Sequence, residues 1–417
     1  MADVEPLRAL RYDLRVVGSL AEVIAPPYDV IDPAQRERLA ARSPFNVVAI
    51  DLPQGRDPYE TAAEQLQEWR LTGAVVKDPE PALWALRQDY TGPGGDPLTR
   101  QGILCRVRVQ DYGPGRIRPH ERTHPGPKED RLRLTRATRA NLSPIFSLYS
   151  DPDLAAWRAI EPALSQAPEG EAVEDDGTQD RLWRIADPDA IAAVQTALAD
   201  AELLIADGHH RYETARAYAE EVGGEGPHRY VLMCLVAMQD PGLTIFPTHR
   251  LVRGLDSGRQ EALAEAIRRD FDISEVEQDQ LAPPPGPGPL QLGYIDAHFR
   301  RCYRLRLRDQ SIADRALHEH SGPYRQLDAG VLEALLLKGA LGLSDEDIAH
   351  LEGFGYARDT DEALELIRRR EYDAAFVLRP TPVAQVQAVA ESGESMPPKS
   401  TYFFPKLPTG LLFNPLE

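Results

Sequence analysis

The chain has 417 residues, a formal net charge of −19 and a pI near 5.0, so it is long enough for two or three domains with sizeable cores. Its acidic balance argues against a general nucleic-acid or anionic-membrane surface, because both would repel the chain at long range. No stretch approaches a membrane-spanning length, and the first residues lack the basic and apolar regions of a signal peptide.

Apolar periodicity predicts a mixed α/β chain, because runs of period two alternate with runs of period 3.6 between glycine- and proline-rich turns. We expect an N-terminal and central region at 1–255 and a C-terminal α/β region at 256–417, whose tail at 396–413 packs back on the site. The proline-rich stretch 282–289 is the best candidate for a linker or surface loop. In chain order, the expected elements are an extended segment at 25–31, a first helix from Asp57, a hairpin of 84–90 with 102–109, a strand at 203–205 running into a helix, strands at 231–238, 301–308 and 374–378, and helices beginning at Asp328, Ser344, Thr360 and Thr381.

The three cysteines are odd in number, lie in apolar or strand-like stretches and show no Cys-x-x-Cys spacing. They are typical of core thiols in a reducing compartment. We therefore expect a cytoplasmic protein with no nucleic-acid or membrane partner.

The stretch 205–215 has the pattern of a phosphate site. A short apolar strand ends at Asp207, Gly208 supplies the turn, and an amphipathic helix follows at once. His209, His210 and Arg211 occupy the first helical turn, where backbone N–H groups and the positive end of the helix dipole already favour an anion. Cations are the wrong charge for an ordinary helix start, which prefers acidic residues. A bound anion is therefore indicated, although a plain turn with a solvated first helical turn is the simpler alternative.

A second cluster, at 118–131, contains His120-Glu121-x-x-His124, the literal zincin signature. Zincin chemistry needs both histidines on one face of a continuous helix, whereas Pro125 disfavours helical geometry at the second histidine. We favour a loop stiffened by prolines, in which Glu121 is available as a general base. A solvated charged loop is the simpler alternative. The cations of this loop that could contact phosphate are Arg122, Lys128 and Arg131.

A third cluster, at 396–406, precedes an expected final strand at 410–413. Lys399, Ser400 and Thr401 carry groups that could bind a phosphate. The neighbouring aromatic residues could more simply anchor a C-terminal tail. By comparison, the lone His249-Arg250 pair after a strand is more simply a satisfied structural pair.

Together these residues resemble a large bacterial family catalogued as a domain of unknown function. The family commonly carries a basic residue at position 124, so the departure at His124 indicates that the zincin match is accidental. The blocks that carry the resemblance are 25–31, His120-Glu121-x-Thr123 with Lys128-Glu129-x-Arg131, 206–211 and 396–401.

The Asp-Gly-His-His-Arg turn is also similar to the phosphate box of the ParB and sulfiredoxin superfamily, whose members bind nucleotides at that turn. Archaeal free-serine kinases of the superfamily carry the same pattern. The resemblance implies a mixed α+β fold with a ParB/sulfiredoxin-like nucleotide-binding core and additional N- and C-terminal α/β elements. It also implies a kinase that uses ATP or ADP, with Mg²⁺, to convert free L-serine to O-phosphoserine.

This hypothesis assigns a role to each predicted site residue. Glu121 is the base that takes the proton from the acceptor hydroxyl, and Asp207 holds Mg²⁺ or orients the histidines. His210 completes the catalytic group. The residues expected to bind the nucleotide and its phosphates are Gly208, His209, Arg211, His120, Arg122, Lys128, Lys399, Ser400 and Thr401.

Two other functions stay open. A non-catalytic nucleotide-binding regulator would use the same turn without needing Glu121, and a metal-dependent hydrolase would use His120, His209 and His210 as ligands. Sulfiredoxin-like reductase chemistry is disfavoured because His209 stands where a reactive cysteine would be required. The acidic charge likewise disfavours DNA binding. The expected partner is thus a small molecule, either free serine or another hydroxyl compound, while the oligomeric state is left open.

Overall fold

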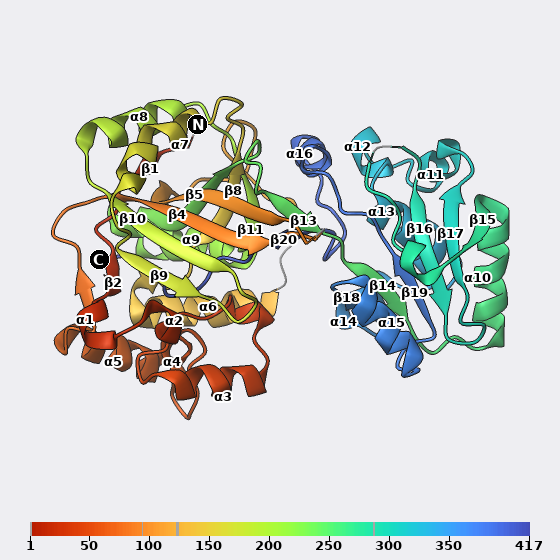
Figure 1. The fold of residues 1–417 in the computed structure, drawn as a ribbon, viewed down its shortest axis with the longest axis horizontal. Helices are drawn as coiled ribbons and strands as arrows, with labels where there is room; N and C mark the ends of the chain where they lie inside the picture. The colour runs from red at the N-terminus through yellow and green to blue at the C-terminus, as the bar shows by residue number, and fades with distance from the viewer. Residues whose placement is uncertain (1, 94, 122–124, 287) are drawn as a thin grey trace. The chain divides into compact units, whose positions relative to one another are not determined.

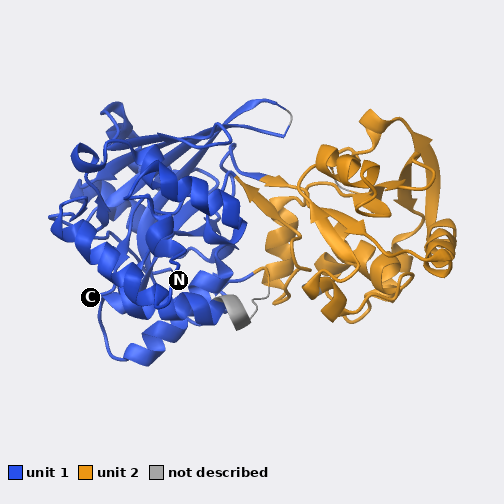
Figure 2. Ribbon diagram, turned by 90° about the horizontal axis from the view of Figure 1, so that it is seen from below, with its two compact units in different colours: residues 1–119, 123–244, 405–417 blue, residues 120–122, 245–404 orange. Residues whose placement is uncertain are grey.

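The computed structural model describes residues 2–93, 95–121, 125–286 and 288–417, and the chain forms two compact units (Figures 1 and 2). Unit 1, blue in Figure 2, comprises residues 1–119, 123–244 and 405–417. Unit 2, orange in Figure 2, comprises residues 120–122 and 245–404. The chain therefore passes from unit 1 into unit 2 and back more than once.

Unit 1 is built on a large mixed sheet. It contains the predicted hairpin, β4 (Leu83–Thr91) with β5 (Pro97–Arg108), and the strand β11 (Leu203–Asp207) that leads into the Asp-Gly turn. β11 pairs antiparallel with β8, and β8 pairs parallel with β12. The strands in spatial order are β6 (Ile117–Arg118), β11 (Leu203–Asp207), β8 (Ile145–Tyr149), β12 (Tyr230–Ala237), β5 (Pro97–Arg108), β4 (Leu83–Thr91), β10 (Gln179–Ile185) and β9 (Gly170–Val173), with β1 (Val4–Glu5) paired to β5.

The core of unit 1 forms where one face of this sheet meets helices. Ile103, Cys105 and Val107 alternate along β5 and join one apolar cluster with Trp157 and Tyr212 of the helices. Period-two alternation places these side chains on one face, so their burial follows from the strand pattern. The helices of unit 1 are α1 (Leu14–Val17), α2 (Leu20–Val23), α3 (Pro33–Arg42), α4 (Val48–Asp51), α5 (Pro58–Leu71), α6 (Pro125–Thr138), α7 (Ala155–Ile160), α8 (Pro188–Leu198) and α9 (His209–Val222).

The C-terminal tail belongs to unit 1 and is held there by backbone pairing. The N–H groups of Thr409 and Phe413 donate to the carbonyls of Ala25 (2.7 Å) and Leu10 (2.8 Å), and Leu10 N–H returns a bond to Phe413. Further small sheets pair β21 (Asn414–Pro415) with β7 (Ala140–Asn141) and β2 (Leu10–Tyr12) with β3 (Val75–Lys77). The tail is thus a fixed part of unit 1.

Unit 2 contains an antiparallel sheet with its own core. Leu251, Ala375 and Val377 of the sheet pack with Leu364 and Ile367 of a covering helix. The strands in spatial order are β15 (Phe271–Val276), β17 (Cys302–Leu307), β16 (Gln291–Asp296), β19 (Ala374–Val377), β14 (His249–Val252) and β18 (Phe354–Ala357). Other elements are α10 (Ser257–Asp270), α11 (Gln310–Ala316), α12 (Gly322–Arg325), α13 (Asp328–Leu332), a π-helix (Glu333–Lys338), α14 (Asp345–His350), α15 (Thr360–Arg368), α16 (Val383–Glu391), and β13 (Thr244–Phe246) paired with β20 (Tyr402–Phe404).

The mixed α/β class is confirmed, whereas the division of the chain differs from the predicted boundary at 255/256. β14 begins at His249 and pairs with β18 and β19, so this segment belongs with the C-terminal sheet. The tail from Pro405 onward belongs to unit 1. The proline-rich stretch 282–289 lies within unit 2, between Leu281 and β16, and is therefore not a linker between the units. Both boundaries depend on pairing between strands that lie far apart in the sequence, and local composition does not predict such pairing.

Most predicted elements are found, with four local corrections. Residues 125–131, expected as part of a loop at 118–131, form the first half of helix α6, because proline is well tolerated in the first turn of a helix. Asp57 does precede a helix, α5, that buries Ala62, Leu66 and Trp69, but shorter helices come before it. The segment expected to be extended at 25–31 contains a 3₁₀ turn at Tyr28–Val30. The final strand is Asn414–Pro415 rather than 410–413, because Gly410 has a positive φ of 93° and forms a turn.

The three cysteines, Cys105, Cys234 and Cys302, are buried and unbridged, as predicted for core thiols. Within the described part of the chain, we found no helix with the length and apolar character needed to cross a bilayer.

His249 of β14 gives unit 2 a testable pH dependence. Its Nδ1 accepts the N–H of Leu378 (3.2 Å), and burial together with the adjacent Arg250 lowers the pKa of His249 to about 4 from 6.5. Between these two values the unfolded chain binds the additional proton, so stability falls as pH falls through that window. The expected loss is about 3 kcal/mol from neutral pH to pH 4.

Hydrogen exchange of the β14 amides, measured at pH 7 and pH 5, checks this expectation. His249→Asn retains an acceptor for Leu378 but cannot be protonated, so its exchange protection should change less between the two pH values. The exposed His318→Asn serves as the matched control. If exchange protection changes equally with pH in the wild type and in His249→Asn, protonation of His249 is not the cause of the pH dependence.

Candidate functional site

The predicted strand, turn and helix around Asp207 are present. β11 ends at Asp207, Gly208 is the N-cap with φ 94° and ψ 28°, and α9 begins at His209. The positive φ requires glycine at position 208, where a Cβ would also lie 2.9 Å from Nε of Arg211 and displace that guanidinium. No acidic residue occupies the first turn of α9. The end of β11 therefore presents a helix N-terminus surrounded by basic side chains.

Asp207 is held between two cations. Its Oδ1 accepts from Nζ of Lys406 (2.7 Å) and its Oδ2 from Nη2 of Arg211 (2.6 Å). Burial alone would raise the pKa of Asp207, but Lys406, Arg211 and then His209 hold it well below its usual range. The carboxylate is therefore ionised and acts as the shared counter-ion of the cluster.

This environment does not fit Asp207 as a magnesium ligand, since both of its oxygens already face cations. Mg²⁺ prefers carboxylate oxygens in a near-octahedral shell with water. Among the described residues, we found no group of three or more His, Cys, Asp or Glu side chains arranged to hold a metal. Of the two roles predicted for Asp207, the geometry favours orientation of the neighbouring basic groups.

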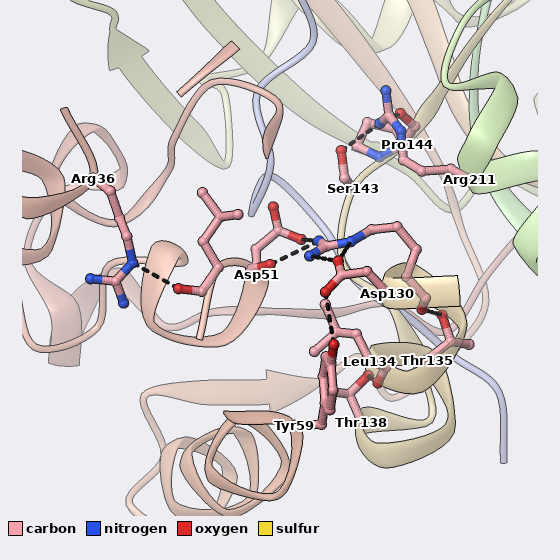
Figure 3. Close-up of polar contacts among 12 residues, drawn as sticks. Arg36, Asp51, Tyr59, Asp130, Leu134, Thr135, Thr138, Ser143, Pro144 and Arg211 are labelled. Carbon is pink, nitrogen blue, oxygen red and sulfur yellow. Dashed lines mark hydrogen bonds and ion pairs between the residues drawn. The ribbon is translucent and has the colours of Figure 1, made fainter. Parts of the chain in front are cut away.

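Arg211 turns back toward the sheet (Figure 3). Its Nη1 donates to Oγ of Ser143 (2.5 Å) and to the carbonyl of Pro144, and its side chain is only 11% exposed. These bonds join the start of α9 to the residues that precede β8. Arg211 was predicted to bind phosphate, and in the structure its guanidinium contacts Ser143, Pro144 and Asp207.

The two histidines differ in burial. His209 is 7% exposed and close enough to Asp207 to lower the pKa of that carboxyl, whereas His210 is half-buried. Lys128 lies on α6, and its Nζ donates to Oε2 of Glu213 on α9 (3.2 Å). The structure thus brings His209 to the Asp207 cluster and places Lys128 beside the helix that follows it.

A neighbouring buried cluster joins two further parts of unit 1. Nη1 of Arg131 donates to the carbonyl (2.8 Å) and Oδ1 (3.1 Å) of Asp51, and its guanidinium lies 4.4 Å from the ring centre of Tyr28. Arg131 was predicted to contact phosphate, yet it is 7% exposed and ion-paired. The sequence prediction assigned no role to Tyr28 or Asp51. A cavity of about 40 Å³ lies among Tyr28, Asp51, Arg131, Ser143, Arg211 and Thr214.

The remaining predicted residues lie in unit 2. Nε2 of His120, which is 1% exposed, lies 2.8 Å from Oγ1 of Thr401 and 3.8 Å from Oε1 of Glu121. The N–H of Met396 donates to the carbonyl of His120 (2.7 Å), and Glu121 forms a β-bridge with Met396. Segments 120–121 and 396–401, far apart in sequence, therefore meet at one place in unit 2. Arg122 and His124, the other predicted residues of this loop, lie outside the described residues.

Lys399 and Ser400 form a turn that a buried arginine supports. Arg250 donates to the carbonyls of Lys399 (3.0 Å) and Pro398 (3.2 Å), and Lys399 has a φ of 55°. Oγ of Ser400 donates to the carbonyl of Pro397 (2.6 Å), so this hydroxyl stabilises the turn. Arg250 has a structural role at this turn, as predicted. Burial lowers the pKa of Arg250, and the nearby Tyr356, Glu333 and Glu121 partly oppose that effect.

Lys406 is the residue at the Asp207 cluster that the sequence prediction missed. It was noted only as the last member of the 396–406 stretch, and no role was assigned to it. The sequence signal that could have indicated Lys406 is its position directly after the run Tyr402-Phe403-Phe404-Pro405. Its partner could not be inferred because 199 residues separate it from Asp207.

A family model described as "Protein of unknown function (DUF1015)" matches residues 4–329. The chain belongs to this family. The membership confirms the family resemblance drawn from the sequence. The blocks at 25–31, 120–131 and 206–211 lie within the matched residues, and the block at 396–401 lies beyond them. No curated protein matches the sequence.

Three solved structures are similar to this chain over most of its length. A free serine kinase in complex with AMP is 12% identical, with 75% of this chain and 91% of that chain covered and a TM-score of 0.38. A conserved hypothetical protein from Pyrococcus furiosus is 14% identical, with 73% and 93% covered and a TM-score of 0.36. SbnI from Staphylococcus aureus, truncated at its C-terminus, is 12% identical, with 72% and 82% covered and a TM-score of 0.36.

Proposed function

We propose that the protein is a nucleotide-dependent phosphotransferase that phosphorylates free L-serine to O-phosphoserine. The observation that carries the proposal is the turn from Asp207 to Arg211. There a helix N-terminus, a histidine and two permanent cations gather around a single carboxylate. Such a surplus of positive charge at a helix N-terminus favours a phosphate group. The sequence pattern shared with free-serine kinases suggests the acceptor.

In this proposal, the backbone N–H groups at the start of α9 bind the donor phosphates together with His209 and His210. Arg211 and Asp207 keep the turn in place through their mutual ion pair and the bonds to Ser143 and Pro144. Positioning and charge neutralisation supply most of the catalysis in phosphoryl transfer, so a site rich in cations suits this reaction. Any Mg²⁺ would enter with the nucleotide, since the Asp207 carboxylate is occupied by cations.

Glu121 is proposed as the base. The hydroxyl proton of the acceptor passes to its carboxylate, and the acceptor oxygen forms a bond to the terminal phosphorus of the donor. The bond from that phosphorus to the bridging oxygen breaks, which releases the nucleotide with one phosphate fewer. His120 and Thr401, hydrogen-bonded to each other beside Glu121, would position it.

The first test is to incubate the purified protein with Mg²⁺, ATP or ADP, and a panel of hydroxyl amino acids, with products identified by mass spectrometry. We expect phosphoserine from the wild type and at least about a tenfold lower yield from His210→Ala, because one phosphate contact is removed. His318→Ala, at an exposed position of unit 2, is the matched control. Nucleotide binding without product from any acceptor would favour the regulatory alternative, and tightly bound zinc in the purified protein would favour the hydrolase.

A further inference from the structure

We propose that Lys406 is a phosphate-binding residue, delivered to the site by the C-terminal tail and held in place by Asp207. This inference rests on the proposed function. It adds a specific contact, from the ammonium group of Lys406 to the terminal phosphates of the donor nucleotide.

The tail holds Lys406 in a defined position. Directly after it, Leu407 and Thr409 are 3% and 0% exposed, and Thr409 exchanges backbone hydrogen bonds with Ala25 in both directions. Phe413, also fully buried, does the same with Leu10. A segment with this much buried backbone pairing has few alternative conformations, so the backbone of Lys406 is held in one position.

A buried glutamine fixes the backbone of Lys406 itself. Nε2 of Gln88, which is 1% exposed, donates to the carbonyl of Lys406 (3.2 Å) and to Oδ1 of Asp180 (2.8 Å). Oε1 of Gln88 accepts from Nε of Arg100 (3.1 Å), another fully buried side chain. The lysine is therefore anchored to the sheet by a polar network that already satisfies the Gln88 amide at both ends.

The charges at the end of β11 explain why a lysine is needed there. Arg211 and Lys406 both contact Asp207, so two permanent positive charges share one negative charge. Arg211 also donates to Ser143 and Pro144, which fixes its guanidinium in the protein. The side chain of Lys406 is 15% exposed. Its ammonium group ends a flexible stem and can turn from a carboxylate to a phosphate. Asp207 orients this group when no phosphate is present.

Isothermal titration of AMP, ADP and ATP into the full-length protein tests the inference. We expect Lys406→Met to weaken ADP and ATP by about 10- to 100-fold, the usual effect of losing a charged phosphate contact. AMP, which lacks the terminal phosphates, should weaken by less than about threefold. Lys77→Met, at an exposed position of β3, is the matched control and should bind all three nucleotides like the wild type.

The ratio of ADP to AMP affinity separates a phosphate contact from a structural role. If Lys406 only supports Asp207 and the fold, the affinities of all three nucleotides will fall together or stay unchanged, and the inference is overturned. If Lys406→Met fails to fold, Lys406→Arg is the second variant. It retains the positive charge and the ion pair with Asp207, and it should still change the ratio of ADP to AMP affinity severalfold. An unchanged ratio in Lys406→Arg overturns the inference in that case. A wild-type protein that binds none of the nucleotides would overturn the proposed function itself, and this inference with it.

Discussion

Glu121→Gln is expected to lower kcat for phosphoserine formation by about 10²- to 10⁴-fold, the usual contribution of a general base. Glutamine has nearly the same shape as glutamate but cannot take a proton from the acceptor hydroxyl at neutral pH. The nucleotide affinity should stay within about twofold of the wild type, because the donor phosphates are bound by the α9 turn. Steady-state kinetics combined with titration of the nucleotide measures both quantities.

The matched control for this variant is Glu265→Gln, which changes an exposed glutamate of α10 in the same unit. Its kcat should equal that of the wild type. A Glu121→Gln enzyme that turns over within a few-fold of the wild type would show that another group takes the proton. A loss of nucleotide affinity equal to the loss of kcat would assign Glu121 to binding rather than to proton transfer.

Asp207→Asn is expected to destabilise unit 1 by about 3 kcal/mol, the lower end of the cost of breaking a buried ion pair. The amide cannot balance the positive charges of Lys406 and Arg211, which would then repel each other at the end of β11. Urea unfolding followed by tryptophan fluorescence is a suitable measurement. All four tryptophans, Trp69, Trp84, Trp157 and Trp183, lie in unit 1, so the signal reports this unit.

The control is Asp200→Asn, an exposed aspartate that precedes β11. Its unfolding midpoint should match that of the wild type. The same pair of variants tests the predicted magnesium role of Asp207. If Asp207→Asn keeps the stability of the wild type but loses a Mg²⁺-dependent shift of the midpoint, the carboxylate binds metal and the positioning role is wrong.

These variants probe two groups of residues that belong to different units. The turn at Asp207 and its partners belong to unit 1, while His120, Glu121 and Thr401 belong to unit 2. The first group accounts for phosphate binding and the second for proton transfer in the proposed reaction. Measuring affinity and kcat separately therefore tests each group by itself.

Local patterns in the sequence were sufficient for several features of this protein. The strand that ends at Asp207, the glycine turn and the helix from His209 follow from short-range periodicity and from the backbone freedom of Gly208. The hairpin of β4 and β5 and the capping box at Ser344 follow from turn and cap chemistry within a few residues. The family also followed from blocks of adjacent residues.

The partners of these residues were decided only by the tertiary structure. Which side chain neutralises Asp207 depends on where the chain returns, and Lys406 reaches it across 199 positions of sequence. Arg211 was expected to contact a phosphate, and the structure places Ser143 and Pro144, which precede β8, where they accept its hydrogen bonds. Residue type and spacing indicate that a cation stands at a helix N-terminus. Whether that cation is paired with a side chain of the protein or contacts a ligand depends on the packing of strands that lie far apart in the sequence.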